Sequence, residues 1–262
     1  MPRHTTLRVV ALLTSVAIAW HSAGGQATGD PKLTEVWTPV PRIITPAAIA
    51  SGAPSDAIVL FGGKTVDAWV TAKDKSPARW TVAKGIMTVN KASGDIMTKQ
   101  SFRDYQLHIE WRIPPGLDKF VGQERGNSGL YLAYDGEDGY ELQILDSYNN
   151  TTYVNGQAGS LYKQTAPLVN AMRKPGAWQT YDVVFTAPRF KADGSVEAPG
   201  YVTAIHNGVL VQDHTALKGF TRYIGAPSYK AHGALPILLQ AHGDPSPPIS
   251  FRNIWVRELG AR

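Results

Sequence analysis

The sequence contains no cysteine, which excludes disulfides, thiolate metal sites and cysteine nucleophiles. After residue 27 no segment approaches the roughly 20 consecutive apolar residues that a membrane-spanning helix needs. No stretch of helical length shows a 3.6-residue apolar period, and no segment recurs at a fixed spacing. What is abundant is glycine (25), proline (18) and aromatic residues (10%), a composition typical of short strands joined by turns.

The N-terminus predicts a secretory signal peptide over residues 1–27. Arg3 and Arg8 precede an apolar run over residues 9–20, and small residues follow it. This run is too short to cross a bilayer, so we expect an exported protein, periplasmic or secreted, with a short membrane anchor as the alternative. Without residues 1–27 the net charge falls from +5 to +3, and the basic residues are scattered, so nucleic acid is not an expected partner. The sequence gives no indication of oligomeric state.

Beyond the signal peptide the composition divides the chain into two parts. Residues 28–56 form a Pro/Ala-rich extended arm, and residues 57–262 form one domain. Two turn sequences, residues 135–139 and Asn207-Gly208, predict hairpins. The long connections 147–178 and 213–235 are expected to form the rim of a binding site. Short β-like runs recur throughout the domain, at residues 58–61, 80–82, 86–89, 105–113, 128–133, 140–145, 180–186, 201–206, 209–212, 237–241 and 249–258. This pattern predicts an all-β jelly-roll sandwich.

Several predicted strands carry polar side chains on one face. Because side chains alternate along a strand, Glu141 and Gln143 point away from Leu142 and Ile144. If the strands share one sheet, eight such side chains line one surface: Glu110, Arg112, Asn127, Tyr131, Glu141, Gln143, Gln240 and His242. The plainer alternatives are a solvent-exposed sheet face, a structural ion pair for Glu110 and Arg112, and a buried, hydrogen-bonded His242.

Conventional glycoside hydrolysis requires two carboxylates that flank the scissile bond. The strand of Glu141 offers only one, since Gln143 and Leu145 occupy the next two positions on that side. Glu110 from a neighbouring strand could be the second, so this chemistry stays open without being favoured. No ligand spacing requires a cofactor or metal, although a divalent metal held by Glu141 and its neighbours is compatible with the sequence.

A set of motifs occurs in order along the domain. They are LFGGKTVDAW (60–69), EWR (110–112), GNSGLY (126–131), YELQILD (140–146), GSLY (159–162), Trp178, HNG (206–208), LQAHG (239–243) and FRNI (251–254). Through them the chain resembles the 3-keto-disaccharide hydrolase domain family, over roughly residues 57–260. The resemblance implies a concanavalin A-like lectin/glucanase sandwich and a carbohydrate substrate.

The resemblance further implies chemistry on glycosides whose C3 hydroxyl is already a ketone. The ketone acidifies the C2 proton, so a base can remove it while the aglycone leaves from C1 and water adds afterwards. The base would be Glu141 or His242. The sugar and its oxyanion would be held by Glu110, Arg112, Asn127, Gln143 and Gln240, with Tyr131 against a sugar face, while Asp146, Tyr162 and Lys163 would approach the leaving group. A non-catalytic lectin-like module and a conventional glycoside hydrolase are the alternative functions.

Overall fold

The computed structural model describes residues 29–260, so the predicted signal peptide lies outside the described residues. The chain divides into two units at residue 43. Residues 29–43 contain one short 3-10 helix, η1 (Pro31–Thr34). The second unit, from residue 44, holds every strand of the described chain, together with the 3-10 helices η2 (Lys91–Ser93), η3 (Gly122–Glu124) and η4 (Val154–Gly156). No helix in residues 29–260 is long and apolar enough to cross a membrane.

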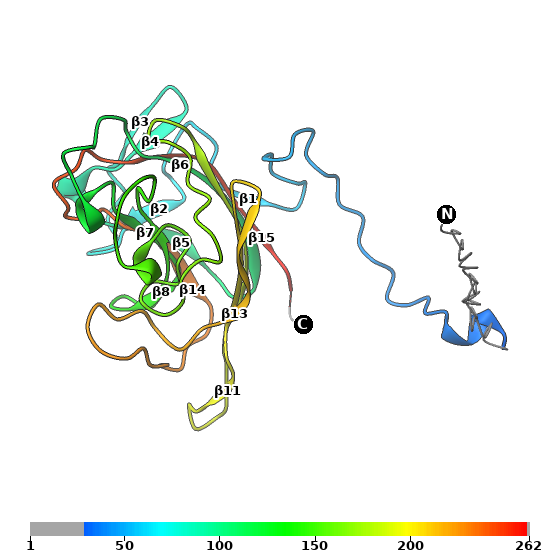
Figure 1. Cartoon of the computed structure of the whole chain (residues 1–262). Coiled ribbons are helices and arrows are strands. Elements are labelled where there is room, and N and C mark those ends of the chain that lie inside the picture. The colour runs from blue at the N-terminus through cyan, green and yellow to red at the C-terminus, as the bar shows by residue number, and fades with distance from the viewer. Residues whose placement is uncertain (1–28, 261–262) are drawn as a thin grey trace, which may run out of the picture. The chain divides into compact units, whose positions relative to one another are not determined.

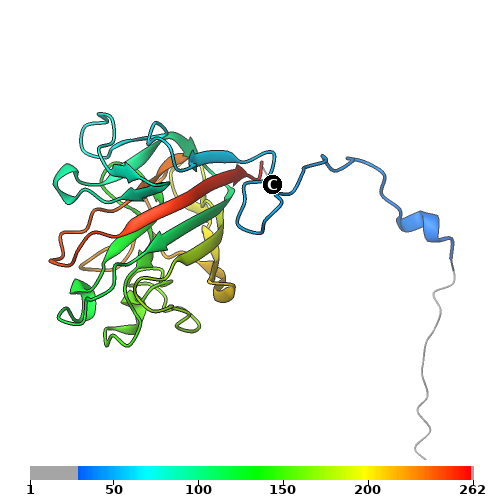
Figure 2. The same cartoon turned by 90° about the horizontal axis from the view of Figure 1, so that it is seen from above.

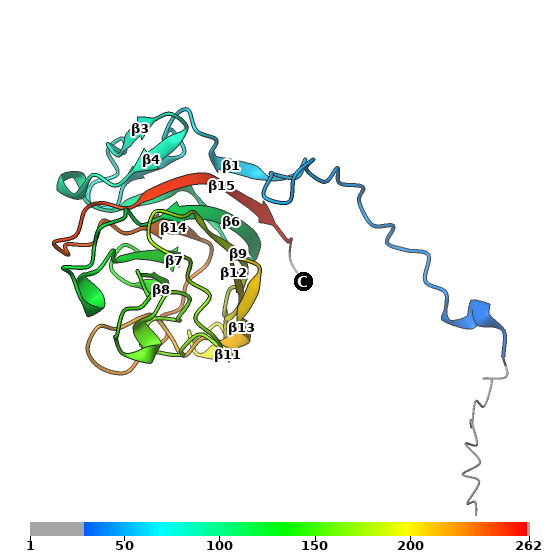
Figure 3. The same ribbon diagram turned by 45° about the horizontal axis from the view of Figure 1, so that its top comes forward.

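Two large antiparallel sheets form the body of the second unit, which confirms the predicted all-β sandwich. The larger sheet has the order β13 (Val209–Ala216), β12 (Tyr201–His206), β9 (Gln179–Thr186), β6 (Tyr105–Arg112), β15 (Ser250–Glu258), β4 (Ile86–Thr88) and β3 (Thr81–Ala83), with β1 (Ile58–Phe61) beside β15. The smaller has the order β2 (Trp69–Thr71), β5 (Ile96–Phe102), β14 (Leu235–Leu239), β7 (Ser128–Tyr134) and β8 (Gly139–Ile144). The larger sheet curves around the smaller one (Figure 3).

The hydrophobic core lies between the sheets and follows the period-two alternation of the strands. Leu107, Ile109 and Trp111 of β6 are fully buried on one side of it, and Leu142 and Ile144 of β8 on the other. The polar residues that alternate with them therefore face outward. In β8 these outward residues are Glu141 and Gln143.

Turn chemistry fixes the two predicted hairpins. Asn207 and Gly208 both have positive φ angles (54° and 84°), the conformation of a tight two-residue connection, and β12 pairs with β13 across it. In the β7–β8 turn the Asp135 carboxylate accepts hydrogen bonds from the backbone N–H groups of Glu137 and Asp138. The register that follows places Tyr131 opposite Glu141.

All eleven predicted runs correspond to strands, but four strands were missed. Two of these, β10 (Arg189–Phe190) and β11 (Val196–Ala198), form a separate hairpin, which projects from the sheets (Figure 1). β2 is only three residues long, and β5 contains the consecutive polar residues Lys99, Gln100 and Ser101, which break the apolar alternation. β5 nevertheless lies between β2 and β14, so tertiary pairing outweighs its local pattern.

Residues 44–56 of the predicted arm belong to the unit that contains the sheets. The backbone carbonyl of Ser51 accepts hydrogen bonds from Asn253 Nδ2 (2.7 Å) and Trp255 Nε1 (3.0 Å) of β15. Arg257 Nε lies 2.8 Å from Asp56 Oδ2. This segment leads into β1, which runs beside β15 (Figure 2). It therefore attaches to the larger sheet, away from the strands that carry Glu141.

Candidate active site

A cavity of about 610 Å³ opens on the outer face of the smaller sheet, over β14, β7 and β8. Eight of the eleven predicted site residues line it: Asn127, Tyr131, Glu141, Gln143, Tyr162, Lys163, Gln240 and His242. Its rim comes from the two long connections that were expected to form it, through Tyr153 and Tyr162 of the first and Thr221 and Tyr223 of the second.

Glu110 and Arg112 do not belong to this surface, so their predicted place beside Glu141 is wrong. They lie in β6, which is part of the other sheet, and alternation within a strand cannot reveal which sheet the strand joins. Glu110 is buried and accepts hydrogen bonds from Arg252 Nε (2.6 Å) and Asn253 Nδ2 (2.9 Å). The Arg112 guanidinium stacks on the ring of Trp178 at 4.6 Å. Glu110 is thus ion-paired to a base other than Arg112.

Asp146 also lies outside the cavity. It follows β8, is fully buried, and its Oδ2 is 2.7 Å from Arg125 Nε. Its Oδ1 accepts a hydrogen bond from the backbone N–H of Tyr148. Asp146 therefore fixes the start of the loop after β8 and has no access to a ligand in this cavity.

Glu141 is a buried carboxylate without a cationic partner in the described chain. Burial raises its pKa to about 8, the Tyr131 hydroxyl lowers it by donating a hydrogen bond, and the charge of Asp95 raises it. The ordinary value is 4.5, so Glu141 is mainly protonated at neutral pH. A carboxyl group of this kind can donate a proton to a reacting atom.

The backbone around Glu141 is fixed from both sides. Its N–H donates to Thr221 Oγ1 (3.1 Å), and its carbonyl accepts from the N–H of Tyr162 (3.0 Å). Space for its side chain comes from Gly129 on β7. A Cβ at position 129 would lie 2.8 Å from Glu141 Oε1 and 2.9 Å from Tyr131 Cε2. Gly129, the second glycine of the GNSGLY motif, therefore allows the carboxyl group and the Tyr131 ring to lie over β7.

Amide side chains form one part of the cavity. Gln143 Nε2 donates to Gln123 Oε1 (3.0 Å), and Asn127 Nδ2 donates to the Gln123 carbonyl (2.9 Å). Gln240 is different, because its buried Oε1 has no hydrogen-bond partner in the described chain. An unpaired buried acceptor is costly, and a hydroxyl of a bound sugar could donate to it.

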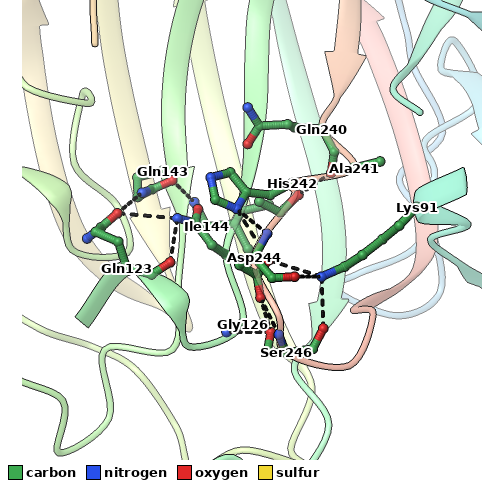
Figure 4. A network of polar contacts seen from close by, with 12 residues as sticks. Lys91, Gln123, Gly126, Gln143, Ile144, Gln240, Ala241, His242, Asp244 and Ser246 are labelled. Carbon is green, nitrogen blue, oxygen red and sulfur yellow. Dashed lines mark hydrogen bonds and ion pairs between the residues drawn. The ribbon is translucent and has the colours of Figure 1, made fainter. Parts of the chain in front are cut away.

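His242 follows β14 and is held by a polar network (Figure 4). Its Nδ1 lies 3.3 Å from Asp244 Oδ2 and 3.1 Å from the backbone N of Asp244, whose N–H donates to Nδ1 when that nitrogen is unprotonated. Burial raises the pKa of Asp244, but hydrogen bonds from His242 and Ser246 and the charge of Lys91 outweigh this effect. The net result is a lowered pKa, so the carboxylate is ionised. Lys91 Nζ lies 3.2 Å from Asp244 Oδ2. The His242 side chain remains 35% exposed and is open to the cavity.

The structure adds residues that sequence reasoning missed: Gln123, Glu124, Tyr153, Thr221, Tyr223, Asp244 and Pro245. Most lie in loops, where alternation gives no signal. Asp244 was missed for the same reason, since the partner that orients a base is recognised by geometry and not by its position in the sequence. Within residues 29–260 no group of three or more His, Asp or Glu side chains is arranged to hold a metal ion.

A sequence profile of the 3-keto-alpha-glucoside-1,2-lyase-like domain matches residues 56–257. The chain belongs to this family. No curated protein matches it. The matched residues include every cavity-lining residue, so the site lies wholly within the lyase-like domain.

Solved structures place this lyase-like domain among similar folds. A candidate glycosyl hydrolase from Parabacteroides distasonis is 55% identical, covers 88% of this chain and 97% of its own, and has a TM-score of 0.82. A second candidate glycosyl hydrolase from the same organism is 19% identical over 80% of this chain and 95% of its own, with a TM-score of 0.55, which shows the shared fold. Family membership and the first likeness support a carbohydrate-active enzyme.

Proposed function

We propose that this lyase-like domain cleaves 3-keto-glycosides by removing the proton on C2 and expelling the aglycone from C1, after which water adds to the resulting double bond. The observation that carries the proposal is the pairing, in one cavity, of a buried carboxyl group with a pKa of about 8 and a partly exposed histidine. Elimination needs one base and one acid, and these two groups have the corresponding properties.

His242 takes the role of the base. Nδ1 faces two groups of Asp244: in one tautomer it accepts a hydrogen bond from the backbone N–H (3.1 Å), and in the other it donates to Oδ2 (3.3 Å). In the second tautomer Nε2 carries the lone pair that accepts the C2 proton. Glu141 takes the role of the acid and gives its proton to the leaving oxygen at C1. Glu141 lies on β8 and His242 lies just beyond the end of β14, and β7 runs between these two strands. Strands in a sheet are about 4.8 Å apart, so we place the sugar ring over β7, between acid and base.

The C3 ketone of the sugar would lie against the amide side chains of the cavity. Removal of the C2 proton places negative charge on the C3 oxygen, and amide N–H groups stabilise such an oxyanion when they are already in place. Gln143 donates one N–H of its Nε2 to Gln123, so its second N–H is held in place for the oxyanion. Asn127 donates to the carbonyl and to Oε1 of Gln123 and thereby holds Gln123 in position. The free Oε1 of Gln240 would accept a hydrogen bond from a sugar hydroxyl.

Conventional hydrolysis is the competing reaction, because it would use Glu141 with a second carboxylate. Asp95 is close enough for its charge to raise the pKa of Glu141. However, Asp95 Oδ1 accepts a hydrogen bond from the backbone N–H of Ala241 (2.7 Å), and Asp95 does not line the cavity. Two other carboxylates line the cavity: Asp244, which is engaged by Lys91 and Ser246, and Glu124, which is exposed in η3. We therefore favour elimination, and the next experiment decides between the two reactions.

Deuterium labelling separates the two reactions. Matched 3-keto and unoxidised disaccharides are incubated with the protein in D2O and followed by mass spectrometry, with enzyme-free samples to measure spontaneous exchange. Elimination followed by hydration adds one deuterium at C2 of the product from the keto substrate, whereas direct hydrolysis leaves C2–H intact. Cleavage of the unoxidised sugar, or product from the keto sugar without deuterium, would contradict the proposal.

Two variants test the assigned roles. Glu141→Gln and His242→Ala should each lower turnover of the keto substrate about 100-fold or more, the usual scale for a lost acid or base. His214→Ala is the matched control, since His214 is exposed on β13 outside the cavity. A lectin-like module would instead bind sugar without turnover in any of these proteins.

We also propose that the protein is exported. Expression of the full chain with a C-terminal tag, followed by cell fractionation and N-terminal sequencing, should give a processed protein outside the cytoplasm. Recovery of the unprocessed chain in the cytoplasm would contradict the signal-peptide prediction.

A further inference from the structure

The cavity extends beyond β8 to a group of aromatic rings that the proposed chemistry leaves unused. Tyr153, Tyr162 and Tyr223, here called the tyrosine wall, line it beside Glu141. The wall begins where residues 159–162 run alongside β8, with Leu161 bridged to Leu142 and the N–H of Tyr162 bonded to the carbonyl of Glu141. It therefore lies on the side of the proton donor, which is the side from which the aglycone leaves.

Tyr223 is the most exposed member of the wall, with 72% of its surface accessible, against 39% for Tyr153. Its backbone is nonetheless fixed, because Lys163 Nζ donates to its carbonyl (2.7 Å) and the N–H of Thr221 donates to the carbonyl of Gly139 (2.7 Å). Arg222 forms an ion pair with Asp138 in the β7–β8 turn. A ring that is held at a cavity mouth but packs on little is prepared to stack on a ligand.

Some of the polar groups in and beside the wall already have partners. The hydroxyls of Tyr153 and Tyr162 bond to each other at 2.6 Å. The amide of Gln123, which borders the wall, already donates to Thr152 Oγ1 and to the carbonyl of Gly156. A second sugar needs partners for several hydroxyls, and this part of the cavity offers few. A flat ring with few hydroxyls fits it better.

Lys163 adds a positive charge to the same place. Its ammonium lies 4.3 Å from the centroid of the Tyr223 ring and 5.5 Å from that of Tyr153, and it has no carboxylate partner in the described chain. A cation at this position attracts the negative charge that develops on a departing phenolic oxygen. It would stabilise an alkoxide too, but the adjoining rings add a preference for an aryl group.

We propose that the tyrosine wall is an aglycone subsite that selects aryl glycosides, with Tyr223 as the stacking residue. This inference rests on the proposed function for its direction, since the aglycone must leave beside Glu141. The subsite itself consists of fixed residues and can be tested by binding alone.

The kinetic test compares phenyl and methyl 3-keto-glucosides of the same anomer. Tyr223→Ala should lower kcat/KM for the phenyl substrate about threefold to tenfold, the effect of one stacking contact, and change that for the methyl substrate less than about twofold. Tyr223→Phe keeps the ring and should behave as the wild type with both substrates. Equal losses for the two substrates, or no loss for either, would overturn the proposal.

The binding test uses the unoxidised phenyl and methyl glucosides and titration calorimetry. Wild-type protein should bind the phenyl glucoside more tightly than the methyl glucoside, and Tyr223→Ala should remove the difference. This result would stand even if no 3-keto-glycoside were cleaved, so failure of the subsite and failure of the proposed reaction are distinguishable. Equal binding of the two glucosides by wild-type protein would reject the aryl subsite.

Discussion

Replacing Glu141 by Gln should change how the stability of the protein depends on pH. In the folded protein burial raises the pKa of Glu141 from 4.5 to about 8. Between these values the folded protein holds a proton that the unfolded chain has released, so stability falls as pH rises. One pKa unit equals about 1.36 kcal/mol, so the free energy of unfolding should drop by roughly 5 kcal/mol across this window. Gln keeps the shape and the acceptor oxygen but cannot ionise, so Glu141→Gln should not show this drop.

The assay is urea unfolding followed by tryptophan fluorescence at pH values from 5 to 9. The difference in free energy of unfolding between Glu141→Gln and wild type should grow with pH up to about 8 and then level off. Glu110→Gln is the matched control, because the pKa of Glu110 is shifted in the opposite direction. Its burial raises the pKa, but hydrogen bonds from Asn253 and Arg252 outweigh this and lower it. The lowered pKa lies below the range of the assay, so removing that carboxylate should destabilise the protein to the same extent from pH 5 to 9.

Parallel curves for wild type and Glu141→Gln would refute the argument. They would mean that Glu141 ionises in the folded protein as easily as in the unfolded chain, either because water reaches it or because a cation pairs with it. The role of Glu141 as a proton donor at neutral pH would then lose its physical basis, whatever the activity of the variant.

Two further predictions concern the geometry of the cavity. Gly129→Ala should lower kcat/KM about 10- to 100-fold by displacing the Glu141 carboxyl group, because a shift of about 1 Å in a reacting group can cost that much. Gly233→Ala is the control: Gly233 lies outside the cavity and an added Cβ meets no atom within 4 Å, so activity should be unchanged, and equal effects of the two variants would contradict the clearance argument. Asp244→Asn should lower kcat with little change in KM, by letting His242 adopt the wrong tautomer, and a pH–rate profile identical to that of wild type would show that Asp244 does not orient the base.

The sequence predicted the sandwich and most of the cavity because both follow from alternation and turn chemistry. Glu141, Gln143 and Tyr131 share a face once the β7–β8 register is fixed, and a short turn fixes that register. Assignment of strands to sheets is a different matter, since β6 and β8 show the same alternation and lie in different sheets. The loop residues Tyr223 and Gln123 were missed because nothing periodic marks a residue that tertiary contacts bring to a cavity.

Glu110 and Glu141 show why environment decides which carboxylate can act. Both are outward-facing residues on central parts of apolar strands, and both are about 5–6% exposed. Glu110 received Arg252 and Asn253 as partners, so its charge is satisfied and its pKa is lowered. Glu141 lies beside Tyr131 and Gly129 at an open cavity, and burial keeps it protonated. A buried carboxyl group that no cation neutralises lowers the stability of the fold. Its position beneath an open cavity therefore points to a functional role, in which its proton is transferred to a bound ligand.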